Sequence, residues 1–164
     1  MNTCESRVSE NLYRHVAASK SSRVLSWNPP NAKSYRAPNL KLPWREGSRR
    51  RRDLVDAIWV STDSLVLAEL KCYTSESEGD IEKLRRIRHQ LGLQDLVTLL
   101  RRQGADLAPE PRQLALVLGV EKLDTDVPAD FTAMEVAEEA IVPFFGSEVG
   151  DDIRNAIKGL CMLT

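Results

Sequence analysis

The chain has 164 residues, of which 42% are hydrophobic and 29% charged, with a formal net charge of −1. This length and balance predict one soluble globular domain, covering residues 1–164, with a real hydrophobic core. No apolar run is long enough to span a membrane and no apolar signal region follows Met1, so we expect no membrane partner. Cys4, Cys72 and Cys161 are widely spaced and odd in number, which predicts reduced thiols in a cytoplasmic protein and argues against a disulfide framework or a zinc site.

The first third of the chain has two regular elements and one long irregular segment. Residues 5–19 are predicted to be a helix, because Val8, Leu12 and Val16 recur on one stripe. Residues 23–27 are expected to form a short strand. Residues 28–52 are basic and proline-rich, and we predict a loop because we find no helical or strand period in them.

Charge is distributed unevenly along the chain. Residues 28–52 carry eight basic residues and a single acid, whereas residues 121–164 carry ten acids and three basic residues. Such polarity predicts one side that faces a polyanion. Tyr35 and Trp44 lie among the basic residues, a combination that can stack bases while neutralising phosphates. We therefore expect the segment to contact nucleic acid; the alternative is a solubilising loop whose arginines are merely solvated.

Residues 54–60 and 65–72 are predicted to form two strands joined by a tight polar turn, since both are rich in Val, Ile, Leu and Trp. Asp56, Glu69 and Lys71 interrupt these apolar runs. With a two-residue turn at Thr62 and Asp63, Asp56 lies opposite Glu69, and Lys71 falls two residues further on the same face. A four-residue turn would set Asp56 opposite Lys71 instead, and a three-residue turn would put Asp56 on the other face.

Ionisable groups on buried strands are costly unless they pair or bind a metal, and opposed carboxylates repel each other. Two carboxylates and a strand carbonyl make an oxygen site that suits Mg²⁺. The ammonium of Lys71 beside such a metal can orient or help to deprotonate a water, or stabilise charge that develops on a phosphate. The pattern predicts metal-assisted hydrolysis of a phosphodiester. The alternative is a structural salt bridge between Lys71 and a neighbouring carboxylate.

Asp56 followed thirteen residues later by Glu69-Leu70-Lys71, in a strand–turn–strand context, resembles the motif of the PD-(D/E)XK nuclease superfamily. The resemblance implies that Asp56, Glu69 and the Leu70 carbonyl bind Mg²⁺, with Mn²⁺ able to substitute, and that Lys71 is the catalytic lysine. It departs from the motif at Val55, where the family has proline. Asp53 looks closer to that dipeptide, but strand parity places it on the opposite face from Glu69 unless a bulge intervenes.

A helix is predicted from about Asp80, with that residue as N-cap, and Gly92 is expected to break it before residues 93–102 resume. Lys83, Arg86 and Gln90 share one face of it. In the family this helix often carries a Lys or Gln toward the active site. The resemblance therefore makes Gln90 or Lys83 an accessory candidate; the alternatives are substrate-backbone contacts or a solvated basic face.

The family also suggests a glutamate of the first helix as an accessory metal ligand, and Glu10 is the candidate. Glu10 lies roughly 160° from the apolar stripe by the 3.6-residue period, so a solvated position is the alternative.

The continuous apolar run at residues 113–120 predicts a central buried strand that is parallel to a neighbour and reached by a helical crossover. Residues 133–141 and 151–163 are predicted to be amphipathic closing helices. The fold class is therefore α/β, with a mixed central sheet and flanking helices. The order helix, strand hairpin, helix, strand is the one that the restriction-endonuclease-like core implied by the resemblance requires.

These observations predict a metal-dependent nuclease that hydrolyses phosphodiester bonds in nucleic acid, with DNA expected over RNA. A homodimer or a partner subunit is expected to help so small a domain grip a duplex. The alternative is a non-catalytic nucleic-acid-binding or assembly subunit with the same fold. The residues expected to hold the nucleic acid are Arg49, Arg50, Arg51, Arg52, Lys83 and Arg86.

Overall fold

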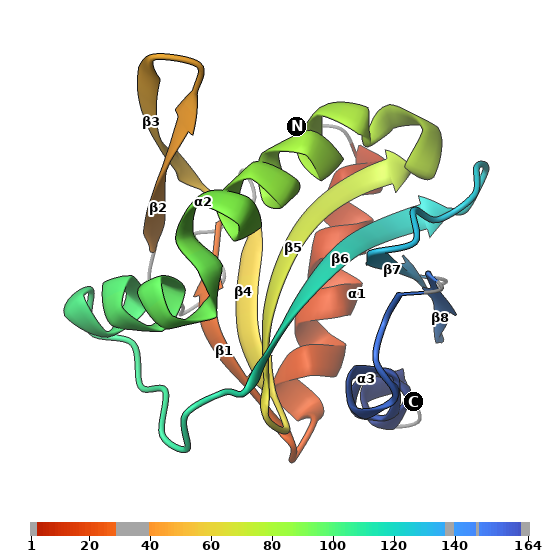
Figure 1. Cartoon of the computed structure of the whole chain (residues 1–164). Coiled ribbons are helices and arrows are strands. Elements are labelled where there is room, and N and C mark those ends of the chain that lie inside the picture. The colour runs from red at the N-terminus through yellow and green to blue at the C-terminus, as the bar shows by residue number, and fades with distance from the viewer. Residues whose placement is uncertain (1–2, 29–39, 137–139, 147, 162–164) are drawn as a thin grey trace.

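The computed structural model describes residues 3–28, 40–136, 140–146 and 148–161 (Figure 1), and only the backbone of Thr3 and of residues 51–54. The helices are α1 (Thr3–Ala18), α2 (Glu78–Arg102) and α3 (Asp151–Cys161), with a short 3-10 helix η2 (Thr74–Glu76). The strands are β1 (Ser22–Trp27), β2 (Lys41–Glu46), β3 (Arg49–Leu54), β4 (Ala57–Ser61), β5 (Ser64–Tyr73), β6 (Gln113–Lys122), β7 (Phe131–Val136) and β8 (Ile141–Phe145).

Six strands form one mixed sheet in the order β1-β4-β5-β6-β7-β8, and β2 and β3 form a separate two-stranded sheet. β1, β4 and β5 are antiparallel neighbours, β6 runs parallel to β5 and β7, and β8 is antiparallel to β7. The chain crosses from β5 to β6 through α2, as a parallel pair requires. The predicted α/β class is confirmed, and the strand predicted at residues 113–120 is β6.

Helices cover both faces of the sheet. α1 and α3 lie on one face, while α2 and the β2–β3 hairpin lie on the other (Figure 1). The neighbouring side chains of Ile58 and Trp59 point to opposite faces, and both are fully buried, so each face has its own apolar core. Within the described residues, no helix combines the length and apolarity needed to cross a membrane.

The helix and the strand predicted at the N-terminus are confirmed as α1 and β1. The helix predicted at the C-terminus is confirmed as α3. The stripe of Val8, Leu12 and Val16 is fully buried against the sheet. Gly92 interrupts α2 with a φ of +67°, a backbone conformation that glycine adopts without steric cost. The break that was predicted there is therefore present.

The β4–β5 hairpin has the register predicted for a two-residue turn at Thr62 and Asp63. Val60 lies opposite Leu65, and Ile58 lies opposite Leu67. Continuing this register by two residues brings Asp56, which directly precedes β4, opposite Glu69. The hairpin therefore places the two carboxyl groups on the face of the sheet that α2 covers.

The loop predicted for residues 28–52 is wrong for the part that the structure describes. Residues 41–46 and 49–54 pair as an antiparallel hairpin, with Gly47 at φ +60° in its turn. Leu42 and Trp44 are buried while Lys41 and Arg45 are exposed, so the period of two was present in the sequence. Pro43 is tolerated because the strand lies in a two-stranded sheet, where it has a free edge. Tyr35 lies outside the described residues.

The helix predicted at residues 133–141 is also wrong where the structure describes it; residues 137–139 lie outside the described part of the chain. Residues 131–136 form β7 and residues 141–145 form β8. Phe131 and Ala133 point into one core, and Met134 into the other. A strand buried on both faces shows no alternation of polar and apolar residues, which explains the incorrect prediction.

The prediction of reduced cysteines fails for two of the three. Cys4, in the first turn of α1, and Cys72, near the end of β5, form a disulfide with 5.7 Å between their Cα atoms. Both cysteines are buried, and 68 residues separate them in sequence. Such a wide separation gives no pairing signal until the fold is known. Cys161 keeps its thiol, and burial raises the pKa of that thiol to about 11.

We expect the double variant Cys4→Ser/Cys72→Ser to lose about 4 kcal/mol of unfolding free energy, because a disulfide across a separation of 68 residues restricts the unfolded chain. Urea unfolding monitored by tryptophan fluorescence measures this loss. A reductant present throughout the titration is expected to bring the wild type to the value of the variant and to leave the variant unchanged. Equal stability of the wild type and the double variant without reductant would contradict the prediction.

Candidate active site

The β4–β5 hairpin holds two carboxyl groups face to face. The Leu70 N–H donates a hydrogen bond of 2.9 Å to Asp56 Oδ2, which ties the Asp56 side chain across to β5 next to Glu69. The backbone at Asp56 is fixed as well, because the Asn28 N–H donates to the Asp56 carbonyl at 2.7 Å. Asp53, the alternative considered from the sequence, pairs with Leu42 in the β2–β3 hairpin instead. Asp56 is thus the aspartate that faces Glu69.

Glu69 is 3% exposed, so its carboxyl group has lost most of its contact with water. Burial, the charge of Asp56 and a hydrogen bond with Asp56 together raise the pKa of Glu69 well above 4.5. The ammonium of Lys83 lowers it, but by less. The raised pKa of Glu69 favours its protonated form beside Asp56, because the two carboxyl groups repel each other when both are ionised.

Two lysines face these acids. Lys83, one turn into α2, forms an ion pair with Glu69, with 2.8 Å between Nζ and Glu69 Oε1. Lys71 places Nζ 3.6 Å from Asp80 Oδ2. Burial lowers the pKa of Lys71, but the carboxylates of Asp80 and Glu5 raise it more, and the net effect is a raised pKa. Lys71 is consequently a firmly protonated ammonium group.

Two acids at this site were missed by the sequence analysis. Asp80 is not the N-cap of α2, because the helix begins at Glu78 and Ser77 is its N-cap. The Asp80 carboxyl instead turns inward, where burial raises its pKa although Lys71 opposes this. Glu5 lies close enough to Lys71 to act on its charge. It precedes Val8 by three residues and so continues the buried stripe of α1, a signal that was present in the sequence.

These four acids and two lysines form one cluster, which we call the carboxylate cluster: Glu5, Asp56, Glu69, Lys71, Asp80 and Lys83. The carboxylate cluster suits a divalent cation by charge and by ligand type. Glu5, Asp56, Glu69 and Asp80 carry four negative charges when ionised, against two positive charges on the lysines. Among the described residues, Asp80 Oδ2 is a buried oxygen without a hydrogen-bond partner.

No three acidic, histidine or cysteine side chains in the described parts of the chain converge closely enough to bind a metal by themselves. A site for Mg²⁺ would therefore consist of Asp56, Glu69, the Leu70 carbonyl and water, since this ion retains several waters in proteins.

Several residues proposed from the sequence lie elsewhere. Glu10 is exposed and pairs with Arg14 at 3.0 Å, so it does not join the cluster. Gln90 binds the backbone of β2: its Oε1 accepts from the Arg45 N–H at 2.6 Å, and its Nε2 donates to the Arg45 carbonyl at 2.7 Å. Gln90 therefore holds the β2–β3 hairpin.

The basic residues of the predicted nucleic-acid surface fall into two groups. Lys83 is at the carboxylate cluster. Arg86 lies at the β2–β3 hairpin instead: its guanidinium is 3.7 Å from Glu46 Oε1 and 5.8 Å from the ring centre of Trp44. Trp44 is 8% exposed, so the prediction that it stacks on bases is wrong.

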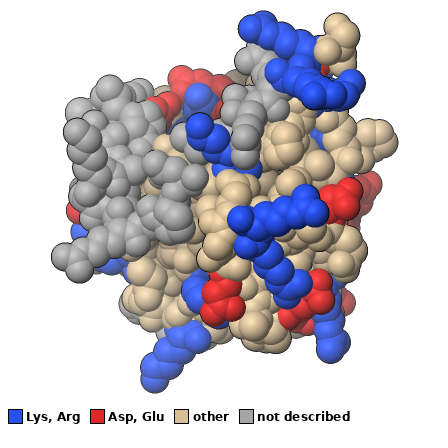
Figure 2. All heavy atoms as spheres, turned by 90° about the vertical axis from the view of Figure 1, so that its left-hand side faces the viewer, with Lys and Arg blue, Asp and Glu red and all other residues tan. Residues whose placement is uncertain are grey.

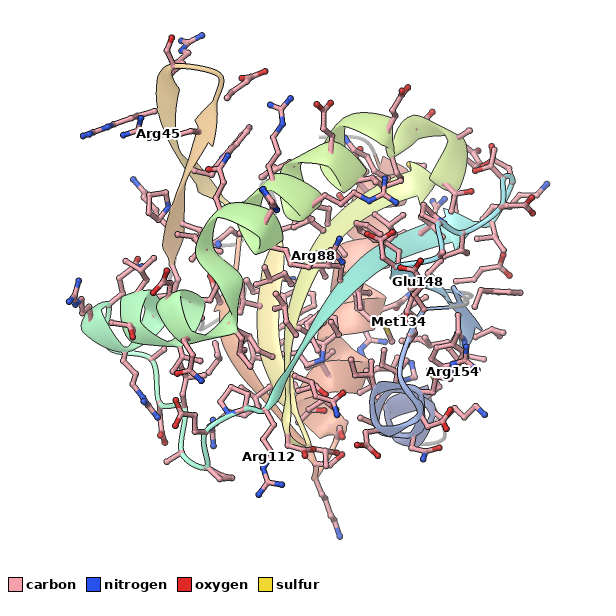
Figure 3. The ribbon with its side chains drawn as sticks, in the orientation of Figure 1. Arg45, Arg88, Arg112, Met134, Glu148 and Arg154 are labelled. Carbon is pink, nitrogen blue, oxygen red and sulfur yellow. A yellow bond between two sulfur atoms is a disulfide. The ribbon has the colours of Figure 1, made fainter. Side chains whose placement is uncertain are left out.

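Arg49 and Arg50 are exposed on the β2–β3 hairpin, while the side chains of Arg51 and Arg52 lie outside the described part of the chain. Figure 2 views the molecule from the side where this hairpin projects and shows Lys and Arg side chains at the top and across the middle of that face. In Figure 3, Arg45 extends from the hairpin away from the central sheet.

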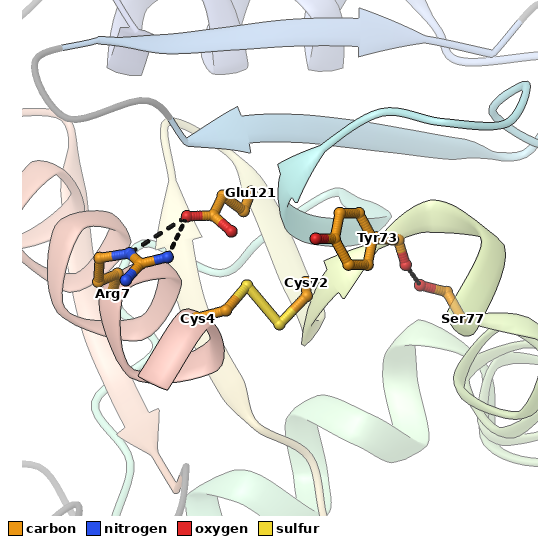
Figure 4. The surroundings of a disulfide bond; sticks show 6 residues. All are labelled: Cys4, Arg7, Cys72, Tyr73, Ser77 and Glu121. Atoms are coloured by element: carbon orange, nitrogen blue, oxygen red, sulfur yellow. Dashed lines mark hydrogen bonds and ion pairs between the residues drawn. A yellow bond between two sulfur atoms is a disulfide. The ribbon is translucent and has the colours of Figure 1, made fainter. Parts of the chain in front are cut away.

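The disulfide joins two residues that are sequence neighbours of the cluster, and Figure 4 shows its surroundings. Cys4 precedes Glu5 and Cys72 follows Lys71, so the bond fixes the start of α1 next to the end of β5. Arg7 joins the start of α1 to the neighbouring strand as well, because its guanidinium lies 2.6 Å from Glu121 Oε1 at the end of β6. The position of Glu5 relative to Lys71 is thus set by a covalent bond.

We expect Glu69→Gln to stabilise the protein at neutral pH. Because the pKa of Glu69 is raised in the folded state, the folded protein binds more protons than the unfolded chain, and stability falls as pH rises above about 4.5. Gln cannot ionise, so the variant is expected to lose this decline while matching the wild type at acid pH. Urea unfolding across the pH range measures the free energy of unfolding of the wild type and of the variant. The same dependence on pH in both proteins would contradict the prediction.

We compared the chain with protein-family models, with curated proteins and with solved structures. None of the three comparisons gives a match. What the chain does has to be inferred from the chemistry of its own residues, above all from the opposed carboxyl groups of Asp56 and Glu69 and the two lysines that face them.

Proposed function

We propose that the protein is a metal-dependent nuclease that hydrolyses phosphodiester bonds in DNA. The observation that carries the proposal is the contact between the carboxyl groups of Asp56 and Glu69 on a buried hairpin. The charge of Asp56 helps to raise the pKa of Glu69, so the arrangement is unfavourable for a structural role alone. A divalent cation between the two oxygens would remove the repulsion.

Each residue of the cluster has a role in this proposal. Asp56, Glu69 and the Leu70 carbonyl would hold Mg²⁺, or Mn²⁺ in its place. The bound ion would supply Lewis-acid stabilisation of the phosphate and an activated water. Lys71, which keeps its proton, would neutralise negative charge that develops on the phosphate. The raised pKa of Lys71 favours this role over removal of a proton from water, the other role considered from the sequence.

The arrangement of the elements supports the same proposal. α1, β1, the β4–β5 hairpin, α2 and β6 follow the order helix, strands, helix, strand, with β5 and β6 parallel. This agrees with the restriction-endonuclease-like core that the resemblance to the PD-(D/E)XK superfamily implies. Lys83 lies on the helix after β5, where that family often has a Lys or Gln near the active site, and it contacts Glu69.

A second candidate is a non-catalytic nucleic-acid-binding subunit with the same fold. The ion pairs Lys83–Glu69 and Lys71–Asp80 favour it, because they already satisfy part of the charge of the cluster within the protein. Both candidates involve nucleic acid and differ in whether the site hydrolyses it. Cleavage in the presence of a metal ion therefore separates them.

We expect labelled single-stranded, duplex or branched DNA to be cleaved in the presence of Mg²⁺ or Mn²⁺. Lys71→Ala is expected to lower the cleavage rate by about 10²-fold or more, because it removes a positive charge aimed at the reacting phosphate. Gel analysis of the end-labelled fragments measures the rates. Addition of EDTA is expected to abolish cleavage by the wild type.

Lys158→Ala is the matched control, since it removes an exposed lysine on α3, an element that packs on the opposite face of the sheet. It is expected to cleave as the wild type does. Equal rates for Lys71→Ala and the wild type would contradict the assignment of the hairpin as the active site. Binding of DNA without metal-dependent cleavage would favour the second candidate.

A further inference from the structure

A concave region lies between the β2–β3 hairpin and α2, and we call it the hairpin groove. Its volume is about 680 Å³, which is within the range of ligand-binding pockets. Three basic side chains line it, those of Arg45, Arg50 and His89, and no acidic side chain of the described residues does so. Pro43 and Leu91 add apolar surface. The groove thus combines positive charge with an apolar wall.

The two arginines of the groove face each other across the hairpin. Arg45 lies directly opposite Arg50 in the register of β2 and β3, and both are exposed. Opposed side chains have Cβ atoms roughly 5 Å apart, where like charges are destabilising. Among residues whose side chains the structure describes, none forms an ion pair with either arginine; the nearby Glu46 lies beside Arg86 instead. An anion between the two guanidinium groups would remove this repulsion.

Two glutamines of α2 hold the hairpin in place. The side-chain amide of Gln90 accepts from and donates to the backbone of Arg45, and that of Gln103 does the same with Lys41, at 2.8 Å in both directions. These contacts use the backbone of β2, so the Arg45 side chain remains available. The groove is therefore preformed, which lowers the entropic cost of binding.

The groove and the carboxylate cluster share one face of α2. Gln90, which lines the groove, follows Lys83 by seven residues, or two helical turns. Two turns extend about 10 Å, roughly three nucleotides at the 3.4 Å spacing of a B-form strand. A strand held in the groove would reach the cluster within a few nucleotides.

We propose that the hairpin groove binds the phosphodiester backbone of a DNA strand, with Arg45 and Arg50 as the phosphate ligands. This site rests on the proposed function, because it names the means by which the substrate of the carboxylate cluster is held. Guanidinium groups suit phosphate oxygens through paired N–H donors. The apolar wall of Pro43 and Leu91 gives room for the sugar and base attached to that phosphate.

The test is the fluorescence anisotropy of a labelled single-stranded DNA oligonucleotide, titrated with protein in EDTA so that no cleavage takes place. Arg45→Gln/Arg50→Gln is expected to weaken binding by roughly tenfold for each arginine at low salt. The slope of log K against log salt is expected to fall by about 1.4, the value for two lost phosphate contacts on a single strand.

Arg112→Gln/Lys158→Gln is the matched control, because it removes two exposed positive charges outside the groove; Arg112 lies at the opposite end of the molecule from Arg45 in Figure 3. It is expected to change binding by less than about twofold, since distant exposed charges are screened by salt. Arg45→Lys/Arg50→Lys keeps both charges and is expected to retain most of the salt slope with weaker affinity, which separates loss of contacts from misfolding.

The outcomes of this test and of the cleavage assay are independent. Unchanged binding by Arg45→Gln/Arg50→Gln, or an equal loss with Arg112→Gln/Lys158→Gln, would overturn the proposed groove even in a protein that cleaves DNA. Loss of binding confined to the Arg45 and Arg50 variants would support the groove even in a protein that cleaves nothing, and it would then favour the non-catalytic candidate.

Discussion

The repulsion between the carboxyl groups of Asp56 and Glu69 is the constraint on which the rest of the site depends. A chain with no use for this arrangement would be more stable with a neutral residue at position 69, because the ionised form of a buried acid is disfavoured. The fold nevertheless holds the pair rigidly, with the Leu70 N–H fixing Asp56 and a two-residue turn fixing the register. Stability is lowered at the place where the proposed nuclease would use closely spaced carboxylates to hold a metal ion.

The neighbouring elements complete this arrangement from three directions. α2 supplies Asp80 and Lys83 from its first turns, and α1 supplies Glu5 from the other side of the sheet. The disulfide between Cys4 and Cys72 joins the start of α1 to β5 (Figure 4), and Cys72 is the residue after Lys71 in the chain. Further along α2, Gln90 and Gln103 hold the β2–β3 hairpin and its arginines. One helix thus connects the carboxylate cluster to the hairpin that carries the exposed Arg45, Arg49 and Arg50.

The sequence predicted the central hairpin and its register because local signals determine them. The apolar runs, the turn and the alternation along β4 and β5 all lie within twenty residues, and they were sufficient to place Asp56 opposite Glu69. The helices of the two termini and the buried strand β6 were predicted for the same reason. The errors have two physical sources.

One source is weak local pattern. β7 is buried on both faces and shows no alternation, and Pro43 and the arginines of residues 41–54 obscured a two-stranded hairpin. The other source is long-range pairing. The disulfide and the inward turn of Asp80 depend on which segments the fold brings together, although Glu5 and Asp80 both lie at helical spacing from buried residues.

The most direct test of the central claim is calorimetric titration of the protein with Mn²⁺ at neutral pH, in two buffers with different ionisation enthalpies. The account predicts saturable binding with release of protons, because a carboxyl group must be deprotonated to bind a cation and the raised pKa of Glu69 favours its protonated form. Asp56→Asn is predicted to lose this binding. A wild type that shows no saturable binding, or that binds Mn²⁺ as Asp56→Asn does, would contradict the claim that the two carboxyl groups form a metal site.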